Sequence, residues 1–490
     1  MFSGGVFLWD NSSIGMDSTA RQIEQIKVTP VVETMAADLL TPLAVYLKLA
    51  ERSEHSFLLE SVEGGRQLAR YSFIGAFPVE VVTGGREAFE RLKEHFSSLT
   101  IASADDDVEL PPFIGGAIGY LGFDACEWFE PSLAGQGDAS QACSFMFYQS
   151  IVAFDHAKQV IRIVSIDVDG DEQMAAWRNK LLRERLEDPH LSVPPNSTSD
   201  DDSPRGGEAK QRKPPHSNWS RPAFEDAVIQ IKELINAGEC YQAVLSQCFT
   251  RETTASPVAI YRALRSVNPS PYMFLLRFGS KTIVGASPEM LVKCDGNKLY
   301  YRPIAGTRPR AKSASEDEAL AEEMRHDKKE VAEHEMLVDL GRNDLGRVAR
   351  YGSVKVDAHM QVEKYSHVQH LVSSLSAALA DGKDRFDALA SCFPAGTLSG
   401  APKVAAIEII RGLEPTPRGV YGGAVGYFDY SGNMDTCIAI RTLVIENGVA
   451  KIQAGAGIVA DSVPELEFEE TVNKAKGLMR AIDIAEGHGG

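Results

Sequence analysis

A glycine-rich run that occurs twice is the feature that most constrains how this chain of 490 residues folds. The run GGAIGY at residues 115–120 recurs almost unchanged as GGAVGY at residues 422–427. Glycines spaced among β-branched and aromatic residues indicate strands whose backbones are closely approached by another part of the molecule. The recurrence therefore predicts that the two halves of the chain share one sheet architecture. Helical and strand patterns alternate along the chain, which predicts a large α+β fold with mixed or antiparallel sheets.

Between the two copies lies a stretch, residues 187–219, that is rich in Pro, Ser, Asp and Lys and poor in apolar side chains. That composition favours a linker or a surface excursion. It predicts an N-terminal domain over residues 27–186 and a C-terminal domain over residues 220–487, with residues 1–26 as a disordered tail. A helix is predicted to begin directly after the linker, with Ser220 as N-cap and Pro222 in its first turn.

The charge of the chain excludes several classes of partner. Fifty basic against sixty-eight acidic side chains give a formal net charge of −18, which repels nucleic acids and anionic membranes. No apolar run approaches the roughly 20 residues of a membrane span, and the first residues lack the features of a secretory signal. The seven cysteines are scattered without a C-x-x-C spacing, which predicts reduced thiols. We therefore expect a soluble cytoplasmic protein.

Three familiar catalytic motifs are incomplete or missing. The run GTLSGAPK at residues 396–403 is similar to a phosphate loop, but no Ser or Thr follows Lys403 to bind Mg²⁺. The run HEMLV at residues 334–338 has Val338 where a zinc protease has its second histidine. No G-x-S-x-G motif is present. The sequence supports neither ATP use nor these types of hydrolysis.

Two pairs of glutamates have the spacing of a metal site. Residues 322–340 are predicted to form one long helix, with Glu330 and Glu333 on one face, and residues 465–479 a second, with Glu467 and Glu470 on one face. Two such helices can converge on a hard divalent cation through their carboxylate oxygens. Taken alone, the same spacing is more often that of solvent-exposed helix faces, since glutamate-rich helices are common.

Residues near the second helix favour an anion-binding site. Gly455 and Gly457 precede that helix and can bring backbone N–H groups close to an anion. Arg441 follows a strand-like segment and can bind a carboxylate through two hydrogen bonds. An anionic substrate needs such local positive charge, because the chain as a whole is negative.

Six long runs, in order along the chain, resemble the chorismate-utilising enzymes, and within that family the anthranilate synthase component I group. The runs are NPSPYMF (268–274), PIAGTRPR (303–310), EHEMLVDLGRNDLGRV (333–348), YSHVQHLVS (365–373), FPAGTLSGAPK (393–403) and AGAGIVADSVPELEFEET (454–471). The resemblance implies a layered α/β/β/α fold, with sheets packed on each other and helices outside. It also implies an Mg²⁺-dependent lyase that converts chorismate to anthranilate, the first step from chorismate towards tryptophan.

The same resemblance assigns roles to individual residues. It implies that Mg²⁺ joins the enzyme to the ring carboxylate of chorismate, with Glu333 and Glu470 as direct ligands and Glu330 and Glu467 in support. The implied substrate-binding residues are Gln242, Thr307, Tyr421, Arg441, Gly455 and Gly457. The implied catalytic residues are Glu289 as general acid, His370 in the later elimination of pyruvate, Thr397 and Lys474.

Two positions bear on the product. Relatives that add water resemble one another in carrying a lysine where this chain has Gln242, and relatives that aminate at C4 carry a lysine where it has Ala305. The resemblance therefore implies attack of ammonia at C2. The alternatives are an aminodeoxychorismate synthase component I and a catalytically silent tryptophan-binding regulator on the same fold.

The resemblance further implies a partner and an inhibitor. Ammonia would come from a separate glutamine amidotransferase subunit, component II, in a heterotetramer, or the chain would form a homodimer. L-tryptophan would bind the N-terminal regulatory domain as a feedback inhibitor. The implied inhibitor residues are Glu60, Ser61, Arg70, Pro271, Tyr272, Met273, Val425, Gly426 and Tyr427.

Overall fold

The structure, a computed structural model, describes residues 26–61, 70–97, 99–101, 109–168, 170, 172–189, 214–365 and 368–488. The predicted tail at residues 1–26 lies outside the described residues except for Ile26. Residues 190–213 of the predicted linker lie outside them as well.

The described residues form two large, almost wholly antiparallel sheets, of 13 and 10 strands, which face each other. Strands β1 and β5 form a parallel pair. The first sheet contains, in spatial order, β10 (His216–Ser217), β11 (Gln242–Glu252), β23 (Val449–Ile458), β22 (Thr442–Glu446), β13 (Lys281–Ser287), β12 (Tyr272–Phe278), β2 (His55–Glu60), β3 (Tyr71–Ala76), β8 (Ser150–Asp155), β9 (Val160–Val168), β1 (Ile26–Ala36) and β5 (Leu99–Ile101), with β19 (Gly400–Ala401) beside β11. The second contains β16 (Ile304–Pro309), β18 (Val368–Ala378), β15 (Lys298–Tyr301), β14 (Met290–Asp295), β21 (Met434–Ile438), β20 (Ala424–Asp429), β6 (Gly116–Leu121), β7 (Cys143–Tyr148) and β4 (Glu80–Gly84), with β17 (Lys355–Lys364) beside β18.

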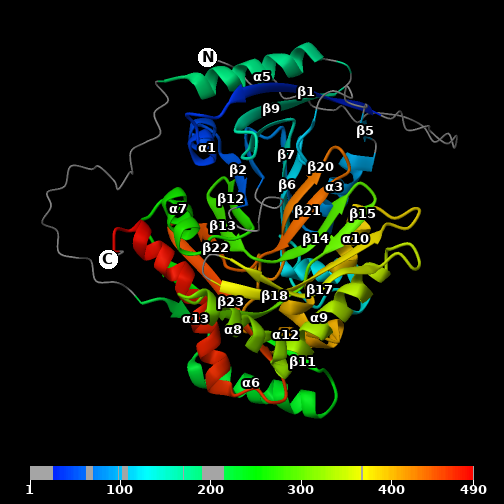
Figure 1. Cartoon of the computed structure of the whole chain (residues 1–490), viewed down its shortest axis with the longest axis vertical. Helices are drawn as coiled ribbons and strands as arrows, with labels where there is room; N and C mark the ends of the chain where they lie inside the picture. The colour runs from blue at the N-terminus through cyan, green and yellow to red at the C-terminus, as the bar shows by residue number, and fades with distance from the viewer. Residues whose placement is uncertain are drawn as a thin grey trace, which may run out of the picture.

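Helices cover the outer faces of both sheets (Figure 1). On the first sheet lie α1 (Pro42–Ala50), α5 (Glu172–Glu187), α7 (Pro257–Val267) and α13 (Pro464–Ala485). On the second lie α3 (Arg86–Ser97), α4 (Cys126–Phe129), α8 (Ala314–His326), α9 (Lys328–Gly346) and α10 (Arg385–Cys392), while α6 (Arg221–Asn236), α11 (Gly396–Ser399) and α12 (Lys403–Leu413) pack against the β11 end of the first. Short 3-10 turns flank α4, at η1 (Phe123–Ala125) and η2 (Pro131–Leu133).

Aromatic and aliphatic side chains such as Phe57, Phe274, Ile118 and Tyr148 fill the space between the sheets. The predicted α+β class with layered sheets and outer helices is confirmed.

The two glycine-rich runs pair with each other. Strand β6 from the first run lies antiparallel to β20 from the second, with Gly119 opposite Gly426. A Cβ added to Gly119 would lie 1.9 Å from the carbonyl oxygen of Ser144, and one added to Gly426 would lie 2.2 Å from that of Asp435. The close approach predicted from the glycines is therefore that of the adjoining strands β7 and β21. The two halves of the chain share the same sheet.

The first sheet also mixes strands from both sides of residues 190–213. Strand β2 pairs with β12 over six residues, from Met273 opposite Glu60 to Phe278 opposite His55. The division of the chain into residues 27–186 and 220–487 therefore does not coincide with a division between sheets. The roles predicted for the two stretches stay predictions.

One predicted helix is two helices, so that prediction was wrong. Residues 322–340 are interrupted at Asp327, which ends α8 and caps α9. The Asp327 carboxylate accepts the backbone N–H groups of Lys329 at 2.9 Å and Glu330 at 3.2 Å. An Asp at such a position satisfies the free N–H groups of a helix start, and here this favours a new helix over continuation of the old one. Glu330 and Glu333 both remain on α9.

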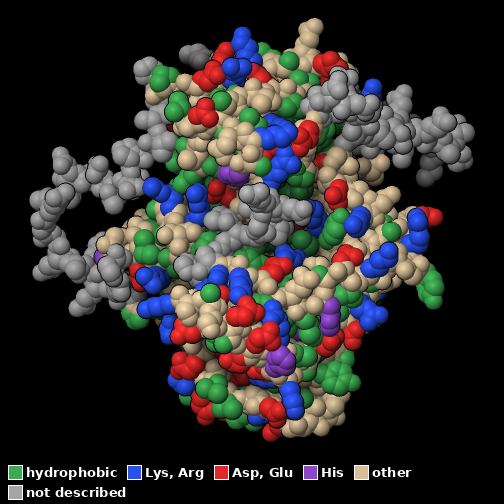
Figure 2. Space-filling view, viewed as in Figure 1, with side chains coloured by type: hydrophobic (Ala, Val, Ile, Leu, Met, Phe, Trp, Pro, Cys, Tyr) green, Lys and Arg blue, Asp and Glu red, His purple; other side chains and the backbone are tan. Residues whose placement is uncertain are grey.

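The helix predicted to follow the linker is confirmed as α6. The Ser220 hydroxyl accepts the N–H of Ala223 at 3.3 Å, and a proline lies in the first turn. Among the described residues, no helix is long and apolar enough to cross a membrane. Acidic and basic side chains are interspersed over the face in Figure 2, so on this face the net charge of −18 is not gathered into one acidic region.

Candidate active site

A cavity with an empty space of about 1160 Å³ opens between the first sheet, the edge of the second and helices α9 and α13. It contains the four predicted catalytic residues and the six predicted substrate-binding residues. They are Glu289, His370, Thr397, Lys474, Gln242, Thr307, Tyr421, Arg441, Gly455 and Gly457. We refer to it as the Glu289 cavity.

Glu289 lies where the chain crosses from one sheet to the other, between β13 and β14. Its backbone carbonyl accepts the N–H of Ile438 at 3.0 Å, and its backbone N–H donates to the hydroxyl of Ser287 at 3.3 Å. The residue is 7% exposed, and its carboxyl accepts a hydrogen bond from the Thr397 hydroxyl at 3.3 Å. Burial raises the pKa of Glu289 to about 8, against the opposing effects of Thr397, Arg441 and Lys474. The carboxyl is therefore protonated at neutral pH.

Two cationic side chains face Glu289. The guanidinium of Arg441 makes no hydrogen bond or ion pair with a described residue, and burial lowers its pKa despite the nearby Glu289. The Lys474 ammonium donates to the carbonyl of Gly455 at 3.0 Å and lies 2.7 Å from the Glu470 carboxylate. A buried cation without a protein partner is costly unless an anion binds beside it.

Two glycines bring the backbone of the cavity wall close to polar side chains. Gly455 and Gly457 lie in β23, paired with β11. A Cβ added to Gly455 would lie 2.8 Å from the Tyr421 hydroxyl, and one added to Gly457 would lie 2.5 Å from the Gln242 amide nitrogen. Any larger residue would push Tyr421 or Gln242 away from the strand.

His370 and Thr307 lie opposite each other on β18 and β16. The Nδ1 atom of His370 is 3.1 Å from the carbonyl oxygen of Gly306 and 3.0 Å from the Thr307 hydroxyl. A carbonyl can only accept, so Nδ1 carries the proton and Nε2 has the lone pair in the neutral ring.

The four predicted metal ligands lie near this cavity but are not gathered on one point. Glu333 lines the cavity. Burial and the charges of Glu330 and Glu470 raise its pKa, and burial also raises that of Glu467. Glu330 is paired with Arg308 at 3.0 Å, and Glu470 with Lys474.

Within the described part of the chain, no three His, Cys, Asp or Glu side chains are close enough together to hold a metal ion. The donor chemistry nevertheless fits a hard divalent cation, because all four predicted ligands are carboxylates and Glu333 and Glu467 each experience the negative charge of Glu470.

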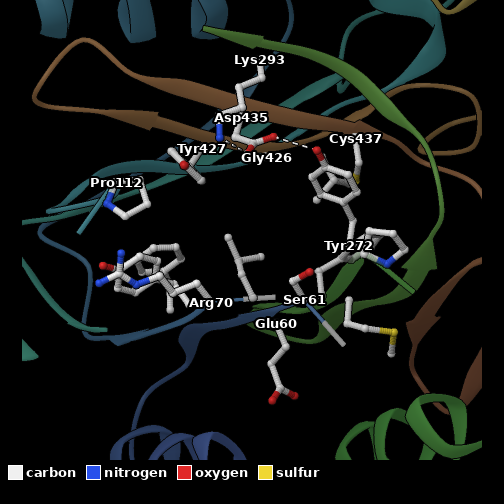
Figure 3. Close-up of a pocket in the computed structure, with 17 residues that line it drawn as sticks. Glu60, Ser61, Arg70, Pro112, Tyr272, Lys293, Gly426, Tyr427, Asp435 and Cys437 are labelled. Carbon is white, nitrogen blue, oxygen red and sulfur yellow. Dashed lines mark hydrogen bonds and ion pairs between the residues drawn. The ribbon is translucent and has the colours of Figure 1, made fainter. Parts of the chain in front are cut away.

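A second cavity, with an empty space of about 800 Å³, lies between β2, β3, β12, β20 and β21. Figure 3 shows its lining, and we refer to it as the Tyr272 cavity. All nine predicted inhibitor residues line it: Glu60, Ser61, Arg70, Pro271, Tyr272, Met273, Val425, Gly426 and Tyr427.

The charged groups around the Tyr272 cavity are paired within the protein. The Tyr272 hydroxyl donates to Asp435 at 3.1 Å, and Lys293 lies 3.7 Å from the same carboxylate. The carboxylate of Glu60 points away from the cavity (Figure 3) and accepts a hydrogen bond from Tyr261 at 2.5 Å. Glu60 therefore lines the Tyr272 cavity with its backbone and the apolar part of its side chain, and its carboxylate lies outside the cavity.

Arg70, at the rim, is held by Asp155 at 2.9 Å and Glu109 at 2.8 Å.

Several lining residues escaped prediction. Val244 could have been predicted, because it lies two residues beyond Gln242 on the same face of β11. Gln453, Lys293 and Asp435 carry no local signal, since each acquires its place only through strand pairing. The remaining lining residues that were not among the predicted site residues are Pro288, Ile304, Gly306, Leu337, Leu398, Ile440, Ala454 and Leu478 in the Glu289 cavity, and Leu59, Tyr71, Phe73, Pro112, Phe274 and Cys437 in the Tyr272 cavity.

The sequence is similar to a known protein family and to individual members of it. A family model described as chorismate binding enzyme matches residues 54–480. The chain is 45% identical over 474 residues to the anthranilate synthase component 1 of Thermus thermophilus, covering 94% of this chain and 99% of the relative. It is 43% identical over 477 residues to that of Pseudomonas putida, covering 93% and 96%.

The fold is also similar to that of solved structures. The anthranilate synthase component I of Streptococcus pneumoniae superimposes with a TM-score of 0.72 at 35% identity, over 91% of this chain and 99% of that one. The menaquinone-specific isochorismate synthase of Escherichia coli gives 0.70 at 20% identity, over 94% and 97%. The second similarity indicates a common fold.

Proposed function

This chain belongs to the family of chorismate-binding enzymes and is a chorismate-utilising lyase of the anthranilate synthase type, and we propose that it converts chorismate and ammonia to anthranilate and pyruvate. The observation that carries the proposal is the meeting of a buried acid, Glu289, with the cations Arg441 and Lys474 in one cavity. A dianionic substrate needs those cations, and departure of its hydroxyl group needs that acid.

Arg441 and Lys474 bind the carboxylates of chorismate in this proposal. The planar guanidinium of Arg441 can grip a carboxylate through two parallel hydrogen bonds, and no described residue competes for it. Tyr421 and the backbone at Gly455 and Gly457 complete the wall against which the substrate lies. The strength of these contacts inside a buried cavity offsets the repulsion expected from the negative protein.

Glu289 acts as the general acid. Its pKa of about 8 keeps a proton on the carboxyl at neutral pH, ready for transfer. Ammonia forms a bond to C2 of chorismate, the C4–O bond breaks, and the departing hydroxide takes the Glu289 proton to leave as water. One proton of the added nitrogen passes to solvent, so that the step balances.

His370 acts in the second step. Its Nδ1–H is held by the Gly306 carbonyl, which leaves the lone pair on Nε2 to remove the proton at C2. Loss of that proton allows the enolpyruvyl C–O bond to break and the ring to become aromatic. The released enolpyruvate takes up a proton on its methylene carbon to become pyruvate. Thr307 keeps the imidazole in this orientation through its contact with Nδ1.

Gln242 and Ala305 determine the product in this proposal. Both line the cavity, and neither can be ionised or attack the ring. Without a lysine at position 242 the cavity has no base there to activate water. Without a lysine at position 305 it has no covalent nucleophile for amination at C4. Ammonia at C2 is the route that remains, which disfavours the alternative of an aminodeoxychorismate synthase.

Mg²⁺ dependence is part of the proposal. Glu333 and Glu470 would hold the ion directly and Glu330 and Glu467 would support them, since the carboxylates influence one another's ionisation. The ion, when bound, neutralises the clustered carboxylates and the carboxylate of the substrate. The ion pairs of Glu330 with Arg308 and Glu470 with Lys474 must then rearrange.

A partner subunit supplies ammonia. The relatives are named as first components, which implies a second component. We propose that the second component is a glutamine amidotransferase, because free ammonia is mostly protonated at neutral pH and cannot attack in that form. The assembly is a heterotetramer or is built on a homodimer. All seven cysteines are free, which supports a location in the reducing cytoplasm.

Tryptophan is the proposed ligand of the Tyr272 cavity and a feedback inhibitor. Aromatic and apolar side chains line the cavity, as an indole ring requires. Two strand pairs connect it to the acid: Tyr272 lies opposite Ser287, and Cys437 lies opposite Met290, on either side of Glu289. Tryptophan can inhibit through this link only if it binds the less active arrangement more tightly.

The experiment uses the purified chain with chorismate, Mg²⁺ and an ammonium salt near pH 8, and follows the fluorescence of anthranilate. Anthranilate is the expected product. Isochorismate or aminodeoxychorismate would refute the assignment. No product, together with tight tryptophan binding, would favour the alternative of a silent regulator; intact Glu289, His370 and Arg441 argue against it.

A further inference from the structure

A buried ion pair lies just outside the Glu289 cavity. Glu414 follows α12, and Arg418 lies four residues later. Arg418 donates from Nε to Glu414 Oε2 at 2.8 Å and from Nη2 to Oε1 at 2.6 Å. The side chains of Arg418 and Glu414 are only 2% and 5% exposed. Neither side chain lines the cavity, so neither can touch a substrate there.

The guanidinium of Arg418 also binds two segments of the cavity wall. Nη1 donates to the carbonyl of Leu398 at 2.6 Å, and Nη2 donates to the carbonyl of Val244 at 2.6 Å. Leu398 lies in α11 beside Thr397, the residue that donates to Glu289, and Val244 lies in β11. One side chain therefore fixes the distance between α11 and β11.

The carboxylate of Glu414 extends the same network to a third segment. Its Oε1 atom accepts both the backbone N–H and the hydroxyl of Ser246, each at 2.8 Å. The hydroxyl of Ser246 in turn accepts the side-chain amide of Gln453 at 2.8 Å. Gln453 lies in β23 and lines the cavity, so β23 is tied to the pair through Ser246.

Tyr421 is the fourth wall residue that the pair supports. The N–H of Tyr421 donates to the carbonyl of Arg418 at 3.3 Å, and the guanidinium lies 5.6 Å from the centre of its ring. On another side the guanidinium lies 4.5 Å from the ring of Phe123. A charge held between two rings and four oxygen contacts has little freedom to move.

Where Arg418 and Glu414 support it, the wall of the Glu289 cavity is a single layer of side chains with a groove on its other side. Tyr421 and Gln453 line the Glu289 cavity and also a groove on the other side, between the loop at residues 416–421 and strands β11, β22 and β23. Arg418 lines that groove as well. A shift of Tyr421 or Gln453 would therefore open the cavity to the groove and admit water.

We propose that Glu414 and Arg418 are positioning residues of the active site. They set the wall formed by Leu398, Val244, Tyr421 and Gln453 without touching the substrate. The inference rests on the proposed function, because its readout is the use of chorismate. The competing explanation is a buried ion pair that contributes to folding alone.

The first test replaces Arg418 by lysine. Lysine keeps the charge but has one compact ammonium group, which cannot serve Glu414 and two carbonyls in a planar fork. The chorismate KM of Arg418→Lys should rise about tenfold to hundredfold, as a small misplacement of the wall predicts, while the Kd for tryptophan stays unchanged.

The matched control is Arg251→Lys, because Arg251 is 11% exposed and forms a comparable pair with Glu486 at 2.7 Å, away from the cavity. A chorismate KM that stays at the wild-type value in Arg418→Lys while Tm falls as in Arg251→Lys would overturn the proposal.

A second test separates positioning from folding. The single variant Arg418→Met leaves the charge of Glu414 buried with only the hydrogen bonds from Ser246 and no cation beside it, so it should lower Tm strongly. The double variant Glu414→Leu with Arg418→Met should recover much of Tm, since both charges are gone, yet keep the raised chorismate KM. A KM that returns to the wild-type value together with Tm would overturn the proposal.

Calorimetric titration with chorismate gives a second readout for every variant. Wild-type protein that binds chorismate but makes no anthranilate would refute the proposed function. The comparison of chorismate Kd between Arg418→Lys and Arg251→Lys would still decide the positioning role. A selective loss of chorismate affinity in Arg418→Lys is the expected result, and equal losses in the two variants would overturn it.

Discussion

The two cavities are built from the same pair of sheets, but they differ in whether their buried charged side chains are paired within the protein. Around the Tyr272 cavity, Lys293 and Asp435 neutralise each other and Arg70 is held by Asp155. In the Glu289 cavity, Arg441 has no partner among the described residues and Glu289 is protonated by burial. A cavity whose polar groups are already satisfied can bind an aromatic ligand and do little else, whereas unpaired charge can act on a substrate.

The largest difference between the two cavities is expected when the charge of the proposed metal ligands is removed. Glu333→Gln and Glu470→Gln should each reduce anthranilate formation about a thousandfold or more, since a bound ion contributes several kcal/mol at such a site. Glu330→Gln and Glu467→Gln should lose about 10-fold to 100-fold, as residues that support a ligand do. Activity is measured against Mg²⁺ concentration, with tryptophan affinity as the control. Equal losses at all four positions would contradict the assignment of direct and supporting ligands.

Removing the acid should have the next largest effect. Glu289→Gln keeps the hydrogen bond from Thr397 but cannot give up a proton, so kcat should fall about 10²-fold to 10⁴-fold. The matched control is Glu60→Gln, the same change at a buried carboxylate beside the Tyr272 cavity. That variant should keep kcat within about twofold, since its partner Tyr261 faces away from the chemistry. Similar losses in the two variants would mean that the cavities do not differ in role.

Filling the Tyr272 cavity should affect inhibition alone. Ser61→Leu adds apolar volume to the lining, so the tryptophan concentration that halves activity should rise about tenfold, while kcat changes little. Ser140→Leu, at an exposed position outside both cavities, serves as the control. The measurement is anthranilate formation over a series of tryptophan concentrations. A lower kcat with unchanged inhibition would reverse the roles of the cavities.

The smallest expected effect is in the pH dependence. Glu289 works in its protonated form, so kcat at a constant concentration of un-ionised ammonia should be level at neutral pH, halve near pH 8 and fall further above it. The sign follows from the raised pKa: the active proton is present below about 8 and lost above it. Tryptophan binding, measured by calorimetry in the same buffers, is the comparison. A kcat that rises through this range would argue against Glu289 as the acid.

Local patterns in the sequence predicted those parts of the fold that depend on short stretches. Ser220 and Pro222 marked the start of α6, and the glycine run predicted strands with closely packed neighbours. Asp327 is an instructive failure, since its side chain ends one helix and starts another where the sequence has no Gly or Pro. An Asp inside a helical pattern is a weak signal, and its effect depends on whether the next turn packs elsewhere.

Long-range features of the sites could not be read from local patterns. The meeting of Glu289, Arg441 and Lys474 was predicted by resemblance alone. Glu289 and Arg441 lie in two separate connections between strands, and Lys474 lies in α13, so no local pattern joins them. The pairing of Lys293 with Asp435 depends on the register of β14 against β21. The contacts of Arg418 with Leu398 and Val244 similarly require three segments to be folded first. Sequence periodicity carries no information about such contacts.

The pairing of β2 with β12 and of β6 with β20 bears on how this protein could be divided. A fragment that begins after residue 213 would lose β2 and β6, leaving the edges of β12 and β20 without hydrogen-bonding partners. Exposed edges of this kind recruit other strands, so such a fragment should aggregate when produced alone. Co-expressed with the preceding fragment, it should regain its missing neighbours by complementation. We therefore expect the described parts of the chain on either side of residues 190–213 to unfold together, because their strands share both sheets.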